Sequence, residues 1–139
     1  SKKVLGYAMA DHLRTELVAD ALRMANRNFA FTAGETIFHS DRGTQYLSTE
    51  FAALTEELGV RRSVGRTGIC YDNAWAESFN GTLKNERVYR TQYPTREHAR
   101  KDITRYIELR YNQIRLHSAI GYRTPNEVES EWLDQMQAA

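Results

Sequence analysis

Hydrophobic residues recur at helical spacing in the middle of the chain. Trp75, Phe79 and Leu83 stand four residues apart, so they share one face of a helix. Asp72 precedes them and can cap this helix, because its carboxylate accepts hydrogen bonds from N–H groups of the first turn. A second face collects the polar side chains and a glycine, namely Asn73, Glu77, Asn80, Gly81 and Lys84. The pattern predicts one packed face and one face that presents an acid, two amides and a lysine.

The remaining pattern alternates short apolar runs with helical stripes. We expect strands at residues 3–9, 37–40 and 60–64, and helices at residues 14–26, 48–58, 95–112 and from residue 124 onward. The strand at 3–9 is weakened by Gly6, whereas the run at 37–40 suits a buried strand. Strand, helix and strand in succession imply a right-handed crossover within one sheet. The pattern therefore predicts an α/β fold, with a single domain over residues 1–139 that ends in helices.

Local signals mark where several of these elements begin and end. Ser48 can cap the helix that ends near Leu58, and Gly59 suits the position just past that end. Thr124, Pro125 and Glu127 form a helix start, with a threonine cap, a proline in the first turn and a glutamate three residues on. The glycine-rich stretch 65–68 predicts a mobile loop directly before the central helix.

Composition excludes several classes of protein. The chain has 139 residues and one cysteine, Cys70, so an intrachain disulfide is excluded and no Cys/His cluster suggests zinc. It has no apolar run long enough for a membrane span and no secretory signal, so we expect a cytoplasmic protein. The formal net charge is only +1, but residues 61–123 carry +7 and residues 124–139 carry −4. A basic segment around the central helix suits the binding of phosphates.

A carboxylate upstream of the central helix changes how that helix is interpreted. A lone Glu-to-Lys pattern is usually a solvated helix face. However, Asp41 follows the strand predicted at 37–40, and open α/β sheets keep their chemistry at the carboxyl ends of strands. Thirty-five residues lie between Asp41 and Glu77. The upstream acid therefore favours a functional site on this helix over a solvated face.

Three ordered motifs place the chain near a known family. The chain carries HSDRGTQY at residues 39–46, CYDNAWAESFNGTLKNE at 70–86 and YNQIRLHSAIGYRTP at 111–125. It resembles the DDE transposases and retroviral integrases, and within them the transposases of bacterial insertion sequences. The resemblance spans nearly the whole chain, and three motifs at family spacing are more specific than a lone short match.

The resemblance implies a ribonuclease H-like integrase core, with a mixed sheet flanked by helices. It implies metal-dependent DNA cleavage and strand transfer, as in DNA integration, recombination and transposition. Asp41 and Glu77 match two members of the Asp–Asp–Glu set, which is expected to hold two Mg²⁺ or Mn²⁺ ions. Lys84 is expected to contact the DNA end near the scissile phosphate, with Asn80 and Arg66 as further DNA contacts. The expected partners are transposon ends, target DNA and further copies of the chain.

The chain departs from the family at its first motif. The family's first aspartate lies on the first strand, and residues 1–7 resemble a later segment, so that aspartate and about two strands are expected before residue 1. Asp11 and Asp20 lie in the wrong elements to replace it. The chain alone is therefore expected to be inactive, and the alternative is an inactive DNA-binding or interaction remnant. His39 suits a structural role, and the sequence assigns no chemical role to Arg115 or His117.

Overall fold

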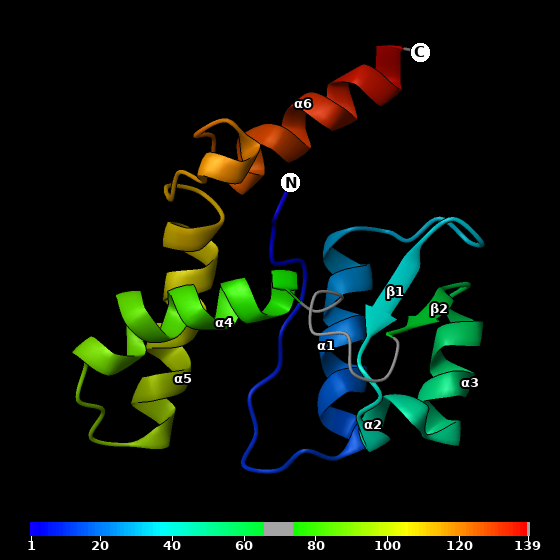
Figure 1. Cartoon of the computed structure of the whole chain (residues 1–139), viewed down its shortest axis with the longest axis horizontal. Coiled ribbons are helices and arrows are strands. Elements are labelled where there is room, and N and C mark those ends of the chain that lie inside the picture. The colour runs from blue at the N-terminus through cyan, green and yellow to red at the C-terminus, as the bar shows by residue number, and fades with distance from the viewer. Residues whose placement is uncertain (66–73, 139) are drawn as a thin grey trace. The chain divides into compact units, whose positions relative to one another are not determined.

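The structure is a computed structural model that describes residues 1–65 and 74–138 (Figure 1). These residues form two compact units, Leu5–Ser78 and the combination of Ser1–Val4 with Phe79–Ala139, and each is described by itself. The prediction of one domain over residues 1–139 stays a prediction. The elements in chain order are α1 (Thr15–Asn28), β1 (Ile37–Ser40), α2 (Thr44–Leu47), α3 (Thr49–Glu57), β2 (Arg61–Val64), α4 (Ala74–Glu86), η2 (Val88–Arg90), α5 (Arg96–Arg105), η3 (Tyr106–Tyr111), η4 (Ser118–Ile120) and α6 (Pro125–Ala138).

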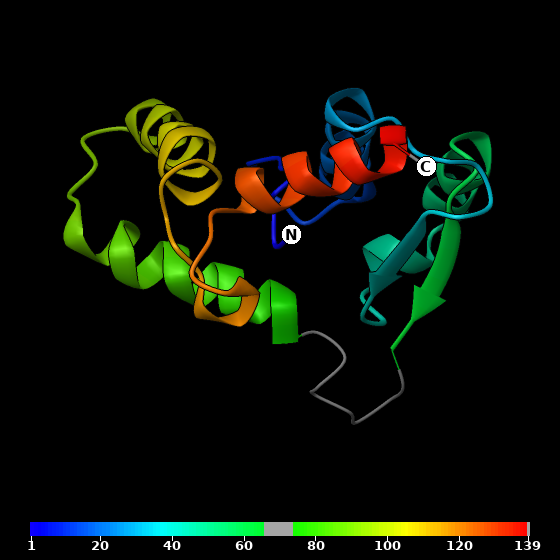
Figure 2. The same cartoon turned by 90° about the horizontal axis from the view of Figure 1, so that it is seen from above.

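A short parallel sheet lies in the unit Leu5–Ser78. β1 pairs with β2 in the register Ile37 to Arg61 through Ser40 to Val64, and Figure 2 shows the two strands side by side. The α/β class is thus confirmed, and the strand predicted at 37–40 has the predicted bounds. This strand is not fully buried, because 58% of Ile37 is exposed. In the described residues the sheet has two parallel strands, without the antiparallel members of the expected mixed sheet.

Aromatic rings form the core under this sheet. The rings of Phe38, Tyr46 and Phe51 lie 5.3 to 5.9 Å apart, and Phe51 is completely buried. They pack with buried side chains of α1 and α3, namely Ala19, Leu22 and Leu54. The predicted cap of α3 is confirmed, since Ser48 Oγ accepts a hydrogen bond from the Phe51 N–H at 3.1 Å. Gly59 takes a left-handed φ of +66° just past this helix, as predicted.

The strand predicted at Lys3–Met9 is wrong, since these residues form no strand. Side chains bind some of their backbone groups instead of a neighbouring strand. Buried Asn112 accepts from the Val4 N–H and donates to the Val4 carbonyl, both at 3.0 Å, and Asn28 donates to the Leu5 carbonyl at 2.8 Å. Gly6 lies so close to α1 that a Cβ there would be 2.2 Å from the Ala21 carbonyl oxygen. The crossover inferred from this strand is therefore wrong as well.

The helix predicted at residues 95–112 forms as two segments. α5 is capped by Thr95, whose Oγ accepts from the His98 N–H at 3.2 Å. It continues into η3, a π-helix in which Tyr106, Ile107 and Tyr111 are all buried. Figure 1 shows α4 running across the direction of α5.

The predicted start of α6 is confirmed in atomic detail. Thr124 Oγ accepts from the Glu127 N–H at 3.2 Å, and Glu127 Oε2 accepts from the Thr124 N–H at 2.7 Å. These reciprocal bonds satisfy two donors at the helix end. None of the helices in the described part of the chain has the length and apolarity needed to cross a membrane.

Candidate active site

Asp41 lies directly after β1, at the carboxyl end of the parallel pair. Its side chain is exposed, and its Oδ1 accepts a hydrogen bond from the Gly43 N–H at 2.8 Å. Arg42 Nε donates to the carbonyl of Gly65 at 3.2 Å, and the Gly65 N–H donates to the Ser40 carbonyl at 2.8 Å. These bonds fix the turn that follows β1 against the end of β2. The turn therefore presents a carboxylate to solvent from a well-supported backbone.

The charge of Asp41 acts on a neighbouring tyrosine. Burial raises the pKa of Tyr46, and the negative charge of Asp41 raises it further. His39 lies two residues before Asp41, and its Nδ1 is 2.9 Å from Ser63 Oγ on β2. This contact across the two strands agrees with the structural role expected for His39.

α4 carries the other predicted site residues on one uncovered face. Glu77, Asn80 and Lys84 are all exposed or half-exposed, and none makes a hydrogen bond or ion pair with another described residue. Gly81 lies between them in sequence, and a Cβ built on it would meet no atom within 4 Å. The face is thus open and offers a carboxylate, an amide and an ammonium group to a ligand.

The apolar face of α4 is less buried than its pattern predicts. Phe79 packs edge-on against Tyr111, with ring centroids 5.0 Å apart. Leu83 is half-buried, but 64% of Trp75 is exposed, so its predicted burial is wrong. No residue of α4 is fully buried. The helix is held mainly along its second half.

Three sequence predictions lie outside the described residues. These are Arg66 as a DNA contact, Asp72 as the cap of α4, and the glycine-rich loop that continues past Gly65. Asn73 and Cys70 fall in the same range.

A polar network that the sequence left without a role holds the end of α4. Glu86, the last residue of α4, accepts hydrogen bonds from Tyr106 Oη at 2.7 Å and from Arg115 Nε at 2.8 Å. Burial alone would raise the pKa of Glu86, but these two bonds and the charge of Arg115 outweigh it and lower that pKa. Burial and the same bond to Glu86 raise the pKa of Tyr106. The network keeps Glu86 ionised and Tyr106 neutral.

His117 extends this network into the buried part of the same unit. Only 5% of His117 is exposed, its Nδ1 lies 3.1 Å from an Arg115 guanidinium nitrogen, and its ring packs edge-on against Tyr111 at 4.8 Å. Arg115 and His117 thus join the third motif to the end of the second. The signal that could have found them is the motif itself, because a charged and a titratable residue stand two apart in YNQIRLHS.

His117 predicts a pH dependence of stability. Burial lowers the pKa of His117, and the charges of Arg115 and Lys2 lower it further, while the Tyr111 backbone and Glu86 oppose this. Because the folded pKa is below the unfolded value of about 6.5, the unfolded state binds the proton more readily. Stability is therefore expected to be full above about pH 6.5 and to fall as the pH drops below it. Urea unfolding between pH 8 and pH 5 measures this slope.

The matched variant for this prediction is His117→Gln, which keeps a polar side chain but does not titrate. Its stability is expected to change less between pH 8 and pH 5 than that of the unchanged chain. An identical slope in both proteins would contradict the assignment to His117.

The donor groups needed for a metal site can be searched among the described residues. No group of three or more His, Cys, Asp or Glu side chains that could hold a metal ion is present within residues 1–65 and 74–138. Asp41 and Glu77 offer hard oxygen ligands of the kind that Mg²⁺ prefers, so the donor chemistry fits a divalent cation in part. Their meeting at one ion stays a prediction.

Comparisons with known proteins give the chain a family. Two family models, both described as integrase core domain, match residues 1–70 and 58–125. The chain is 42% identical over 123 residues to the insertion element IS600 uncharacterized 31 kDa protein of Shigella sonnei, covering 88% of this chain and 45% of that protein. It is 36% identical over 129 residues to the transposase for insertion sequence element IS904 of Lactococcus lactis, covering 93% and 51%.

A third relative gives the same result. The transposase InsF for insertion sequence IS3A of Escherichia coli is 36% identical over 137 residues, which covers 94% of this chain and 45% of that protein. The chain thus spans about half the length of these relatives.

A solved structure shows a similar fold. A chain in the cryoEM structure of the simian T-cell lymphotropic virus intasome in complex with PP2A regulatory subunit B56 gamma aligns with a TM-score of 0.59. The match covers 78% of this chain and 37% of that one, at 15% sequence identity, so it supports the integrase-like fold alone. The family models and the named relatives confirm the resemblance drawn from the three motifs. The chain belongs to the integrase core domain family, and it is similar to about half of the length of named transposases of bacterial insertion sequences.

Proposed function

We propose that this chain is the catalytic-core portion of a DNA transposase that cuts and joins DNA with a divalent metal. The observation that carries the proposal is the exposed polar face of α4, on which Glu77, Asn80 and Lys84 lie. Gly81 on the same helix leaves room for a ligand to approach, because a Cβ built there would meet no atom within 4 Å. Membership of the integrase core domain family supports the proposed reaction class. The activity belongs in the cytoplasm, where bacterial DNA lies.

Asp41 and Glu77 would hold the metal, which when bound neutralises charge on the phosphoryl oxygens and activates the attacking hydroxyl. Asp41 is suited to this because one carboxylate oxygen is occupied by the Gly43 N–H, which orients the group. Lys84 lies two helical turns beyond Glu77 and would bind a DNA phosphate. Asn80, between them, would donate or accept a hydrogen bond at the DNA backbone or a base edge.

We further propose that a third carboxylate, carried with further strands by a longer form of the protein, completes the site. Two carboxylates supply only part of the ligands that a two-metal centre needs. The test compares residues 1–139 with a form as long as the relatives in a strand-transfer assay with Mg²⁺ or Mn²⁺, using chelator as the control. Activity in the longer form alone supports the proposal. Equal activity in both would place the third ligand within residues 1–139, and a longer form that binds DNA without cutting it would favour the inactive remnant.

Lys84→Ala is expected to weaken DNA binding with little loss of stability. The ammonium group is unbonded within the described residues, and surface changes usually alter the free energy of unfolding by less than about 0.5 kcal/mol. Loss of one phosphate contact should also reduce the slope of log K against log salt by about 0.9. Fluorescence anisotropy with a duplex of the element's end, at several salt concentrations, measures both quantities.

The matched control is Lys101→Ala. Lys101 is an exposed helix lysine on α5 that pairs with Glu97 at 2.7 Å. Its removal is expected to leave the affinity and the salt slope nearly unchanged. If Lys84→Ala binds DNA as tightly as the control does, Lys84 is not part of the site.

A further inference from the structure

A groove on α5 and η3 combines apolar walls with arginine side chains. It encloses about 480 Å³. Leu109 and Ile114 line it and are 46% and 63% exposed, while buried Tyr106 forms part of its floor. Arg105 and Arg110 also line it, and neither forms an ion pair with another described residue. An apolar centre bordered by arginine is the composition of a protein-binding surface rather than of a phosphate track.

One wall of the groove contains the Arg87–Asp102 ion pair. Arg87 Nε donates to Asp102 at 2.6 Å, and Tyr93 Oη donates to the same carboxylate at 2.7 Å. The hydrogen bond from Arg87 lowers the pKa of Asp102, so this wall stays paired at neutral pH. The positive charge available to a ligand therefore comes from Arg105 and Arg110.

The second half of α6 has the complementary composition. Leu133 and Met136 are 38% and 61% exposed on this helix, and Asp134 lies between them in sequence. The helix contains four acidic residues and no lysine or arginine. Its first half is held by the ion pairs of Glu129 with Lys3 and of Glu131 with Arg123. Every residue from 131 to 138 is exposed.

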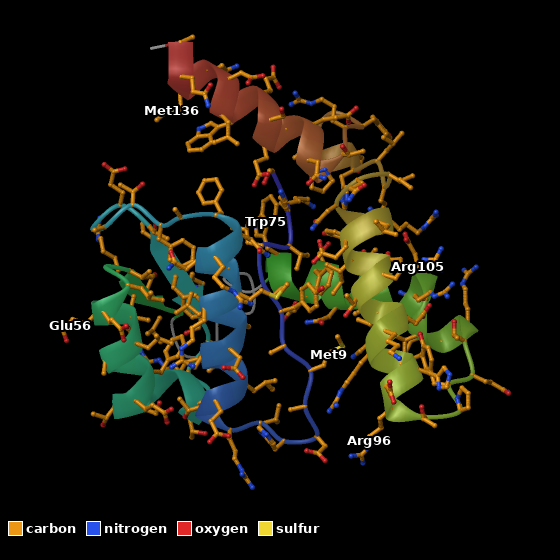
Figure 3. All side chains as sticks on the ribbon, turned by 180° about the vertical axis from the view of Figure 1, so that it is seen from behind. Met9, Glu56, Trp75, Arg96, Arg105 and Met136 are labelled. Carbon is orange, nitrogen blue, oxygen red and sulfur yellow. The ribbon has the colours of Figure 1, made fainter. Side chains whose placement is uncertain are left out.

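One copy of the chain does not bring these two surfaces together. Both belong to the unit that contains Phe79–Ala139, and Figure 3 shows Arg105 on α5 and Met136 on α6 far apart within it. We propose that the second half of α6 from one copy binds in the groove of a second copy. Leu133 and Met136 would bury against Leu109 and Ile114, and the acidic helix would meet Arg105 and Arg110. This contact does not depend on the proposed catalytic activity.

The contact is most stable when it is reciprocal. Each copy has one groove and one α6, so a pair related by a two-fold axis exchanges both helices and closes. Non-reciprocal exchange would instead join copies head to tail into open chains. We therefore expect a closed dimer with two equivalent contacts.

The experiment measures the mass of residues 1–139 by sedimentation over a range of concentrations at low salt. The unchanged chain is expected to be a dimer. Two variants, Arg105→Glu with Arg110→Glu in the groove and Leu133→Ser with Met136→Ser on α6, are each expected to weaken dimerisation about thirtyfold or more. The matched control, Arg100→Glu, reverses an exposed charge on α5 outside the groove and should leave the mass unchanged.

Two further experiments distinguish a lost contact from a folding defect. One mixes the two double variants, and the other reverses the charges on both sides of the contact. An equal mixture of the groove variant and the α6 variant retains one intact groove and one intact helix, so it should form dimers more readily than either variant alone. Asp134→Arg combined with Arg110→Glu should likewise restore part of the dimerisation that Arg110→Glu loses.

Three outcomes would overturn the proposal. They are a monomer at every concentration, a dimer whose dissociation is unaffected by either double variant, and a groove variant that loses DNA affinity while its mass stays that of the unchanged chain. The last result would identify nucleic acid as the occupant of the groove.

Discussion

Replacing Asp41 with Asn or Glu77 with Gln, in a form of the protein that is active, is expected to abolish metal-dependent strand transfer. Each change keeps the shape of the side chain and removes a negative ligand. Metal stabilisation of a phosphoryl transition state is worth several kcal/mol, and losing about 4 kcal/mol slows the step roughly a thousandfold. Rates of strand transfer at saturating DNA, over a range of Mg²⁺ and Mn²⁺ concentrations, measure this effect.

These variants are expected to fold normally. In Asp41→Asn the new amide would still offer a side-chain oxygen to the Gly43 N–H, so the turn after β1 is retained, and Glu77 makes no hydrogen bond or ion pair with a described residue. Glu97→Gln on α5 is the matched control, since it removes an exposed carboxylate that lies outside the three motifs. A variant at position 41 or 77 that retained more than about a tenth of the activity would argue against a ligand role, because that loss corresponds to only about 1.4 kcal/mol.

Arg115→Ala is expected to reduce the free energy of unfolding by about 2 kcal/mol. The change leaves Glu86, whose side chain is only 31% exposed, without its charged partner, and it removes the guanidinium next to His117. Losing one member of a buried ion pair costs about 3–5 kcal/mol, and the partial exposure of this pair reduces the figure. Urea unfolding followed by circular dichroism measures the loss.

A double-mutant cycle separates this network from general effects of the substitution. Arg115→Ala and Glu86→Gln should together cost clearly less than the sum of the two single changes, because each removes the other's partner. Arg100→Ala is the control for losing an exposed arginine and should change stability by no more than about 0.5 kcal/mol. Additive costs for Arg115 and Glu86 would show that the two residues act separately.

Much of the local structure could be predicted because its causes are local. Ser48 caps α3 and Thr124 caps α6 through bonds to residues three positions away, which a sequence pattern records directly. The strand at 37–40 was found from its composition, and with it the position of Asp41. The polar face of α4 followed from helical spacing alone.

The predictions that failed depended on partners distant in sequence. Residues 3–9 have the apolar content of a strand, but they form none, and Asn112 bonds to both backbone groups of Val4. Likewise Arg115 gains a role only from Glu86, which lies 29 residues earlier. Trp75 follows the apolar spacing of α4, yet no such spacing says how far the opposing surface extends. The proposed meeting of Asp41 and Glu77 at one metal ion depends on tertiary packing in the same way.

The π-helix at Tyr106–Tyr111 leads into the third motif. In this segment the number of residues matters as much as their identity. Tyr106 and Tyr111 are five residues apart and both almost fully buried, with ring centroids at 6.5 Å. In an α-helix five residues turn through about 500°, which would put these side chains on different faces. The wider turn, visible in the bond from the Asn112 N–H to the Ile107 carbonyl, brings them to one side. Natural variation should therefore exchange side chains here more readily than it adds or removes a residue, since a single deletion would rotate everything from Asn112 onward by about 100°.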